Sequence, residues 1–485
     1  MRILLASSEV HPYSKTGGLG DSVGALGKAL ARTGHQVVTV TPLHRGIREN
    51  FDGLRRVDWR FNLPLGKRQV DAQLLALDVA PRHTVYFIDQ PEFFDRAGLY
   101  NDGQHDYADN AERFIFFSKC VVHLARYLPF KPEVVHVHDW PVGLVPLLAK
   151  TEHEIAPWPD FPRFCLTIHN LAYQGVFPRP AFDLTNLPVK CFNVETTEFY
   201  GQLNCLKAGI ATADVVTTVS PRYAREITTE PFGAGLDGLL RRRRADLIGI
   251  LNGVDYDEWN TINNPFLSAS YNAADLAGKA ICKRALQKRF QLEVDSKLPL
   301  FGNVSRLVAQ KGVNLMLGAL EQAFAAPIPM QFVMLGSGDQ KFEMALRDLA
   351  ARYVGRIGLQ FGYDQGLAHQ IEAGSDFFLM PSRFEPCGLN QLYSLRYGAI
   401  PIVRRTGGLD DTVIDATDNS AQANGIKFDA AESSALLKAI QKAWLLFQDA
   451  KLLKRFRLNG MRADFSWEQV VTALEAAYRN DSRLQ

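Results

Sequence analysis

The sequence predicts an α/β protein with two domains, each built on a parallel sheet. Residues 2–7 have the composition of a buried strand, residues 20–33 of a helix, and HQVVTVTP of a second strand, which together make one β-α-β unit. Apolar strands that end in polar residues follow in VVHVHDW, FCLTIHN and DVVTTVS, and a second series opens with LPLFGNVSRL. Strands and helices that alternate in this way form parallel sheets with crossover helices.

Two helices and the domain boundary depend on local signals. Apolar residues recur at helical spacing in two stretches, at Val23, Leu26 and Leu30 and again at Val470, Leu474 and Ala477. A chain of 485 residues exceeds the size of one ordinary core. We place the boundary near residues 250–262, where the chain becomes polar in NTINNPFLSASYN. This predicts domains of residues 1–250 and 251–464.

The composition argues against two kinds of partner. The chain has 54 basic and 52 acidic residues, a net charge of +2, so it gives no reason to expect binding to nucleic acid or to a membrane surface. The apolar start MRILLASS is too short for a signal peptide or a membrane span. Six cysteines form no C-x-x-C pair, which favours free thiols in a reducing compartment. We therefore expect a cytoplasmic protein.

The stretch YSKTGGLGD lies between the first strand and the first helix. Gly17 and Gly18 let the backbone approach a ligand and free the local φ, while the helix N-terminus favours an anion. Lys15 adds a mobile positive charge. These features predict a phosphate or sugar-phosphate site, and the alternative is a glycine-rich turn with a surface lysine. The letters T-G-G-L-x-D return within residues 404–413, either as a weak internal repeat or by chance.

The second domain offers further groups for binding anions and sugars. Arg306 and Lys311 follow its first strand, and two cations on one loop can grip a diphosphate, although the pair alone is better explained as surface cations. Glu385 precedes a helix that begins near Gly388, and it either accepts hydrogen bonds from sugar hydroxyls or caps the helix. Cys387 is interpreted as a packing residue, because no histidine accompanies it.

Histidines end two strands of the first domain. HVHDW places His136 and His138 on one face of a strand with Asp139 at its end, and TIHN ends the next strand with His169. A metal site needs more ligands than are evident here, so we expect neither a metal nor another cofactor. We interpret the group as polar residues at the solvent end of the strands, or as an Asp139 that binds sugar. His169 is either a structural histidine or a residue that faces a cleft.

The motifs together resemble one family along nearly the whole chain. They are SSEVHPYSKTGGLGD, HVHDW, TIHNLAYQG, TVSPRYAREI, GILNGVDYDEWN, VSRLVAQKG and PSRFEPCGLNQLYSLRYG. They resemble, in order, those of bacterial glycogen synthases and plant starch synthases that use ADP-glucose. The resemblance implies a GT-B fold, in which two Rossmann-like domains face a deep cleft and residues 465–485 return to the first domain. It also implies transfer of glucose from ADP-glucose to the non-reducing 4-hydroxyl end of glycogen, starch or a maltooligosaccharide, with retention of configuration.

The resemblance assigns roles to individual residues. Asp139 and His169 are expected to contact the transferred glucose, Arg306 and Lys311 to clamp the diphosphate, and Glu385 to bind glucose. The other residues expected to bind substrate are Lys15, Gly17, Gly18, Asp21, Asn170, Tyr363, Cys387, Gly388, Leu389 and Asn390. Within that set, Tyr363 is expected to stack on adenine. No carboxylate is a convincing nucleophile, and the resemblance implies that a front-face reaction gives retention.

The chain departs from the family pattern at three places. Asn390 replaces the usual threonine, WNTINNPF lacks the usual acidic residue, and Tyr393 stands where the wider superfamily has a second glutamate. Apart from these departures, two other functions stay open. One is a catalytically silent protein that binds glucan, and the other is a transferase that uses UDP-glucose or a different acceptor.

Overall fold

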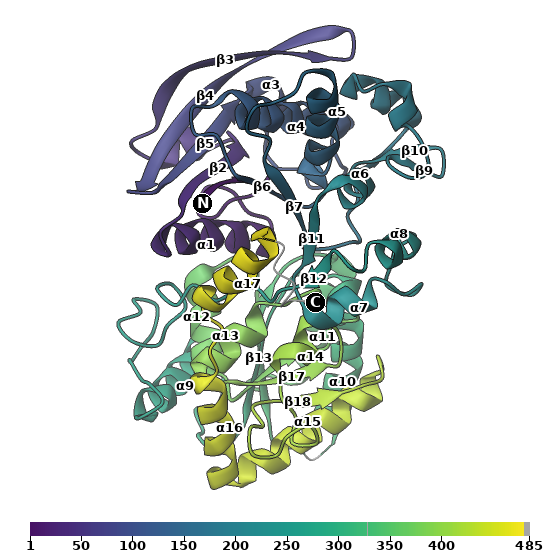
Figure 1. Ribbon diagram of the computed structural model, residues 1–485. Helices are drawn as coiled ribbons and strands as arrows, with labels where there is room; N and C mark the ends of the chain where they lie inside the picture. The colour runs from purple at the N-terminus through teal and green to yellow at the C-terminus, as the bar shows by residue number, and fades with distance from the viewer. Residues whose placement is uncertain (327, 480–485) are drawn as a thin grey trace. The chain divides into compact units, whose positions relative to one another are not determined.

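A computed structural model describes residues 1–326 and 328–479 of the chain (Figure 1). It divides into an N-terminal unit, Met1–Gly253 with the segment from Trp467 onward, and a C-terminal unit, Val254–Ser466. Each unit carries its own hydrophobic core around its own sheet, which is mostly parallel in the N-terminal unit and fully parallel in the C-terminal unit. The α/β class expected from the sequence is confirmed. No helix within the described ranges is long and apolar enough to cross a membrane.

The main sheet of the N-terminal unit has the strand order β12-β11-β7-β6-β1-β2-β5-β4-β3. Its strands are β1 (Arg2–Ala6), β2 (Gln36–Pro42), β3 (Arg55–Leu65), β4 (Arg68–Ala80), β5 (His83–Asp89), β6 (Val134–His138), β7 (Arg163–Ile168), β11 (Val215–Thr218) and β12 (Leu247–Gly249). The strands from β12 to β5 pair in parallel, whereas β4 runs antiparallel to both β5 and β3. This antiparallel hairpin forms the edge of the sheet in Figure 1. A small sheet joins β8 (Val176–Phe177), β10 (Gln202–Asn204) and β9 (Glu198–Phe199).

Helices connect the strands of this unit. They are α1 (Gly18–Arg32), α2 (Ile47–Asn50), α3 (Pro91–Phe94), α4 (Asn110–Tyr127), α5 (Val145–Ile155), α6 (Cys205–Thr212), α7 (Pro221–Glu226), α8 (Asp237–Arg242) and α17 (Trp467–Arg479), with short 3-10 helices η1 (Trp140–Val142), η2 (Arg179–Thr185) and η3 (Val189–Cys191). The apolar stripe predicted for the last helix is confirmed, since Val470, Leu474 and Ala477 are buried on α17. They pack with Leu26 of α1 and Ile3 of β1 in one core cluster. The C-terminal helix therefore completes the core of the N-terminal unit.

The C-terminal unit is a purely parallel sheet of strand order β15-β14-β13-β16-β17-β18. Its strands are β13 (Leu300–Val304), β14 (Gln331–Gly336), β15 (Ile357–Phe361), β16 (Phe377–Met380), β17 (Ile400–Arg404) and β18 (Ile426–Phe428). Its helices are α9 (Ala277–Arg289), η4 (Ala309–Lys311), α10 (Val313–Ala325), α11 (Gln340–Arg352), α12 (Gln365–Gly374), α13 (Asn390–Tyr397), α14 (Gly407–Thr412), α15 (Ser433–Gln448) and α16 (Ala450–Arg462). In parallel sheets ligands bind at the carboxyl ends of the strands. Strands β13 and β16 are parallel neighbours, so the loops that follow them lie side by side at that edge.

Candidate active site

Three neighbouring strands bring the first group of candidate residues to one edge of the N-terminal sheet. Strands β7, β6 and β1 are adjacent and parallel, so their carboxyl ends lie together. Asp139 follows β6, His169 and Asn170 follow β7, and Glu9 follows β1. The structure therefore brings together Asp139, His169 and Asn170, as the sequence predicted, and adds Glu9.

Asp139 is held by its neighbours in a rarely populated backbone conformation. Its φ of 60° and ψ of −172° fall in a region that is almost confined to glycine. Its Oδ1 accepts hydrogen bonds from the backbone N–H of His169 at 2.7 Å and of Asn170 at 3.4 Å. Burial raises the pKa of Asp139 from 3.8 to about 7, against the opposing effect of these hydrogen bonds. A strained, buried carboxyl with a pKa near neutrality is typical of a functional site.

His136 and His138 are buried and each contacts another side chain, so neither faces solvent. His136 and His138 are each 1% exposed, so the interpretation of polar residues at the solvent end of the strand is wrong. His138 Nδ1 lies 3.1 Å from His169 Nε2, while His136 bonds Tyr478 of α17 at 2.8 Å. Burial lowers the pKa of His169 to about 3 and that of His138 well below its usual value. Both rings are therefore neutral at physiological pH.

The proton between His138 and His169 has a preferred position. His138 Nε2 is buried and has no hydrogen-bond partner among the residues of the described ranges. A buried N–H without an acceptor is rarer in proteins than an acceptor without a donor. His138 therefore carries its proton on Nδ1 and donates it to His169 Nε2. The Nδ1–H of His169 then stays available as a donor to a ligand.

Glu9 links the glycine-rich loop to Asp139, and sequence reasoning did not single it out. Its carboxylate accepts hydrogen bonds from the backbone and the hydroxyl of Thr16 and, at 2.7 Å, from the hydroxyl of Tyr100. Burial raises the pKa of Glu9, although these hydrogen bonds oppose the shift, and its charge raises the pKa of Asp139. The only signal was its place in the motif SSEVHPYSKTGG. Glu9 therefore holds the loop in position over the strand ends.

The glycine-rich loop is compact and leaves open space on one side. Lys15 Nζ donates to Asp21 Oδ1 at 2.9 Å, which closes the loop onto the first turn of α1, where Gly18 is the first residue. A side chain added at Gly17 would meet no atom within 4 Å. The φ of Gly17 is −170°, an extended conformation that any residue adopts, so conformational freedom is not the reason for a glycine there. The open space above Gly17 agrees with the predicted close approach of a ligand.

In the C-terminal unit, one lysine joins two groups that the sequence analysis treated separately. Lys311 Nζ donates to Glu385 Oε2 at 2.6 Å, and the hydroxyl of Ser382 donates to the same oxygen at 2.9 Å. The Glu385 side chain is 7% exposed, whereas the Lys311 side chain is 21% exposed and its ammonium group has two further N–H donors. Arg306 is exposed, and its guanidinium has no hydrogen bond or ion pair with any residue that the structure describes. Arg306, which has no charged partner among the described residues, thus lies on the same loop as a lysine that orients a carboxylate.

The second T-G-G-L-x-D stretch packs against the backbone of residues 385–387. The backbone N–H of Gly408 donates to the carbonyls of Glu385 and Pro386 at 3.1 and 3.0 Å. A side chain at Gly407, whose φ is +43°, would lie 1.9 Å from the Glu385 carbonyl oxygen. A side chain at Gly408 would lie 2.2 Å from the carbonyl of Cys387. The repeated letters therefore have a packing role here that differs from that of the first copy.

The first turn of α13 has no side-chain cap, so Glu385 does not take the capping role that the sequence left open for it. Asn390 is the first residue of α13, and its amide donates to the carbonyl of Val304 at the end of β13 at 2.5 Å. Leu389 occupies the N-cap position and Gly388 has a φ of +73°, so this turn requires glycine. The side chain of Asn390 therefore tethers the helix to the sheet and leaves the helix N–H groups for a ligand.

Two tyrosines have contrasting surroundings. Tyr393 stacks on Trp259 with ring centroids 3.6 Å apart and planes within 3°, which gives the residue in the place of the second glutamate a packing role. Tyr363 follows β15 and is 76% exposed, so its ring presents a face to solvent. Cys387 is buried at 4%, as expected for a packing residue. The structure thus gathers all the C-terminal candidates except Tyr363 around the carboxyl ends of β13 and β16.

Two families of known proteins match this chain, and together they define the class of protein to which it belongs. The family described as "Starch synthase catalytic domain" matches residues 2–242, and "Glycosyl transferases group 1" matches residues 285–462. The two units are thus those of a glycosyltransferase with two Rossmann-like domains. The sucrose-phosphate synthase of Thermosynechococcus elongatus, at 18% identity and a TM-score of 0.61, shares this fold.

Closer relatives define the family. A glycogen synthase of Thioalkalivibrio sulfidiphilus is 48% identical and one of Anaeromyxobacter dehalogenans 46% identical, each over 99% of both chains. The catalytic domain of starch synthase IV from Arabidopsis thaliana, bound to ADP and acarbose, has a TM-score of 0.90 at 34% identity and covers 99% of this chain and 98% of that one. The chain belongs to the glycogen and starch synthase family. The predicted family and fold are confirmed, and the roles of individual residues stay predictions.

Proposed function

We propose that the chain transfers glucose from ADP-glucose to the non-reducing 4-hydroxyl end of an α-1,4-glucan, with retention of configuration, and so elongates glycogen. The contact that carries the proposal is Lys311 Nζ on Glu385 Oε2, because one ammonium group there joins a sugar-recognising carboxylate to a diphosphate grip. The relatives named glycogen synthase and the starch synthase with ADP and acarbose support the same donor and acceptor.

The C-terminal unit stabilises the leaving group. Negative charge grows on the diphosphate as the glycosidic bond breaks, and Arg306, Lys311 and the N–H groups at the start of α13 face that charge. Hydrogen bonds to charged groups contribute about 1.5–3 kcal/mol each, so three or four supply about 5–12 kcal/mol. Enzymes lower barriers by about 8 kcal/mol or more, so positioning of the reactants supplies the remainder. Tyr363, whose ring is exposed, stacks on the adenine.

The N-terminal unit holds the transferred glucose. Asp139 and the Nδ1–H of His169 bind its hydroxyls, and Asn170 lies beside them. Lys15 and the backbone at Gly17, Gly18 and Asp21 bind the donor from the loop before α1. His138 is a positioning residue, because it fixes which nitrogen of His169 carries the proton.

Retention follows from a front-face reaction in this proposal. Glu385 accepts two hydrogen bonds on one oxygen, from Lys311 and Ser382, which orients the carboxylate toward sugar hydroxyls and lowers its nucleophilicity. The leaving phosphate then assists the incoming 4-hydroxyl on the same face of the sugar. We place the reaction in the cytoplasm, because all six cysteines are buried free thiols.

A donor comparison tests the function. Glucose transfer to glycogen is measured from ADP-glucose and, separately, from UDP-glucose, with EDTA present, for wild type and Lys15→Ala. We expect metal-free transfer from ADP-glucose that the substitution weakens. A preference for UDP-glucose would move the protein to another donor class. No transfer from either donor would favour a different acceptor or the silent glucan-binding protein.

A further inference from the structure

The loop between β16 and α13, residues 381–389, has its backbone carbonyl groups tied to the rest of the C-terminal unit. Each carbonyl oxygen from Ser382 to Gly388 accepts a hydrogen bond from a group outside the loop. The donors are the guanidinium of Arg404 to Ser382 at 2.9 Å and to Arg383, the amide of Gln310 to Phe384 at 3.4 Å, the N–H of Gly408 to Glu385 at 3.1 Å and Pro386 at 3.0 Å, and the amide of Gln391 to Cys387 at 2.9 Å and Gly388 at 3.1 Å. The negative ends of these peptide dipoles therefore point into the protein.

The N–H groups at the end of the same loop are placed differently. Those of Gly388, Leu389 and Asn390 have no acceptor among the residues that the structure describes, and all three residues are partly exposed. A loop whose carbonyls are bound to the protein, and whose N–H groups are open to a ligand, presents partial positive charge. Such a loop suits the diphosphate of the donor.

Gln391 controls the turn that carries these N–H groups. Its side chain is fully buried, and its Nε2 donates to the carbonyls of Cys387 and Gly388 and, at 3.2 Å, to the hydroxyl of Thr412. The reverse orientation of the amide would place its oxygen against two carbonyl oxygens, so these contacts fix which end faces the turn. A side chain added at Gly388 would lie 2.4 Å from Gln391 Oε1, so the amide leaves room only for glycine there.

Thr412 of α14 connects this amide to the second T-G-G-L-x-D stretch. Its hydroxyl donates to the carbonyl of Gly408 at 2.6 Å, which leaves the oxygen to accept from Gln391. The N–H of Gly408 in turn donates to the carbonyls of residues 385–386. The hydrogen bonds therefore form a circuit from residues 385–386 through Gly408, Thr412 and Gln391 to residues 387–388. Thr412 is 1% exposed, so water does not compete for these contacts.

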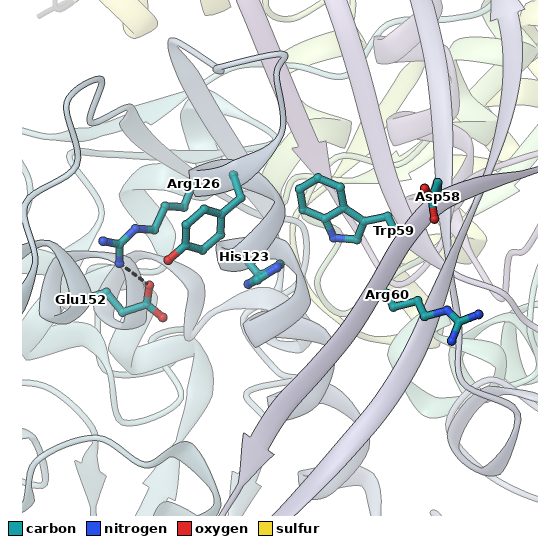
Figure 2. Close-up of a pocket in the computed structure, with 7 residues that line it drawn as sticks. Asp58, Trp59, Arg60, His123, Arg126 and Glu152 are labelled. Carbon is teal, nitrogen blue, oxygen red and sulfur yellow. Dashed lines mark hydrogen bonds and ion pairs between the residues drawn. The ribbon is translucent and has the colours of Figure 1, made fainter.

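The groove drawn in Figure 2 offers no comparable place for a diphosphate. It lies at the β3 edge of the N-terminal sheet and is lined by residues of β3, α4 and α5. Its charges balance, because Arg60 and Arg126 are matched by Asp58 and Glu152, and Arg126 bonds Glu152 at 3.4 Å. A diphosphate site carries net positive charge, so the loop before α13 is the better candidate.

We propose that Gln391 and Thr412 are positioning residues for the donor, an inference that rests on the proposed function for the identity of the ligand. They hold the carbonyls of Cys387 and Gly388 toward the protein, so that the N–H groups at the start of α13 point at the diphosphate. Both side chains are buried, so they act through the turn and not by contact with the ligand. A carbonyl that rotates toward the phosphates repels them most in the transition state, where the leaving diphosphate gains negative charge.

Nucleotide binding tests the proposal without turnover. The affinity for ADP is measured by isothermal titration calorimetry for wild type, Gln391→Met, Thr412→Val and Thr412→Ser. Methionine and valine keep the shape of the side chain and remove its hydrogen-bonding groups, whereas serine keeps the hydroxyl. We expect the Kd for ADP to rise about tenfold in Gln391→Met and Thr412→Val, and to stay within about twofold of wild type in Thr412→Ser. Thr412→Val keeps the test decisive if Gln391→Met does not fold, because it exchanges one hydroxyl for a methyl group.

Asn459→Leu is the matched control. The amide of Asn459 also donates to two backbone carbonyls, those of Ala421 and Ala423 at 3.0 and 2.9 Å, but neither belongs to the loop before α13. This variant should lower the melting temperature and leave the Kd for ADP unchanged. If Gln391→Met and Thr412→Val also lose only melting temperature, their hydrogen bonds are structural and the proposal is overturned.

Kinetics separate this proposal from the proposed function. With ADP-glucose, kcat should fall about tenfold in Gln391→Met and Thr412→Val, while the KM for glycogen stays at the wild-type value. A wild-type kcat in Thr412→Val, with a wild-type Kd for ADP, would overturn the positioning role. A wild type that binds ADP about tenfold more tightly than Thr412→Val, but transfers no glucose, would overturn the proposed function alone.

Discussion

Replacement of Asp139 by asparagine should stabilise the protein, with a pH dependence that the structure sets. Asp139 is 8% exposed and its pKa is raised from 3.8 to about 7. This is about three pKa units, and at 1.36 kcal/mol per unit the ionised carboxylate costs about 4 kcal/mol above pH 7. Below pH 4 the carboxyl is protonated in both the folded and the unfolded chain, so the cost vanishes there. Wild type should therefore lose stability relative to Asp139→Asn as the pH rises from about 4 to about 7.

The assay is thermal unfolding of both proteins at intervals between pH 4.5 and 8. A domain of this size shifts its melting temperature by roughly 2–4 °C per kcal/mol, so the gap should reach about 8 °C or more at pH 8. A gap between wild type and Asp139→Asn that stays constant with pH would refute the reasoning.

Asp376→Asn is the matched control with the opposite sign. Burial alone would raise the pKa of Asp376, but Lys283 at 2.7 Å and Arg457 at 2.5 Å lower it overall. Its carboxylate therefore stabilises the fold above its unfolded pKa of 3.8, and this stability is lost as the pH falls toward the lowered value. The control variant should be less stable than wild type at neutral pH. An increase in its stability would show that the pKa directions are misassigned.

Three further predictions follow from individual contacts. Arg306→Ala should lower kcat/KM for ADP-glucose by roughly 10- to 150-fold, because it removes one hydrogen bond to a charged group, and it should leave the melting temperature unchanged. Wild-type turnover in this variant would show that Arg306 does not bind the diphosphate. Gly407→Ala should lower both stability and activity, because the new methyl group meets the Glu385 carbonyl. The control Gly355→Ala, at a φ of +75° with open space around it, should keep its activity. Equal losses of activity in the two variants would contradict this prediction. His138→Phe should lower kcat more than it raises the KM for ADP-glucose and should change the pH profile, and an unchanged profile would argue against its positioning role.

The parallel cores of both units were predictable because their strands are continuous apolar runs. The hairpin β3–β4 was not predicted, since its strands face water on one side and the bulge between Val57 and Arg60 interrupts the alternation of polar and apolar residues. The groove at this edge was invisible for the same reason.

In the candidate site, strand ends were predictable and long-range contacts were not. Asp139 and His169 follow apolar strands, so a parallel sheet must place them at one edge. The contact between Lys311 and Glu385 joins residues 74 positions apart, and no local pattern encodes it. The tether from Asn390 to Val304 depends in the same way on how α13 meets β13.

The most direct test of the central claim is the structure of the product. Wild type is incubated with ADP-[13C]glucose and maltotetraose, and the anomeric carbon of the added residue is followed by NMR. We expect a new α-1,4-linked glucose at the non-reducing end and stoichiometric release of ADP. A β-linked product, free labelled glucose, or unchanged maltotetraose would contradict the proposal that this protein is a retaining glucan elongase.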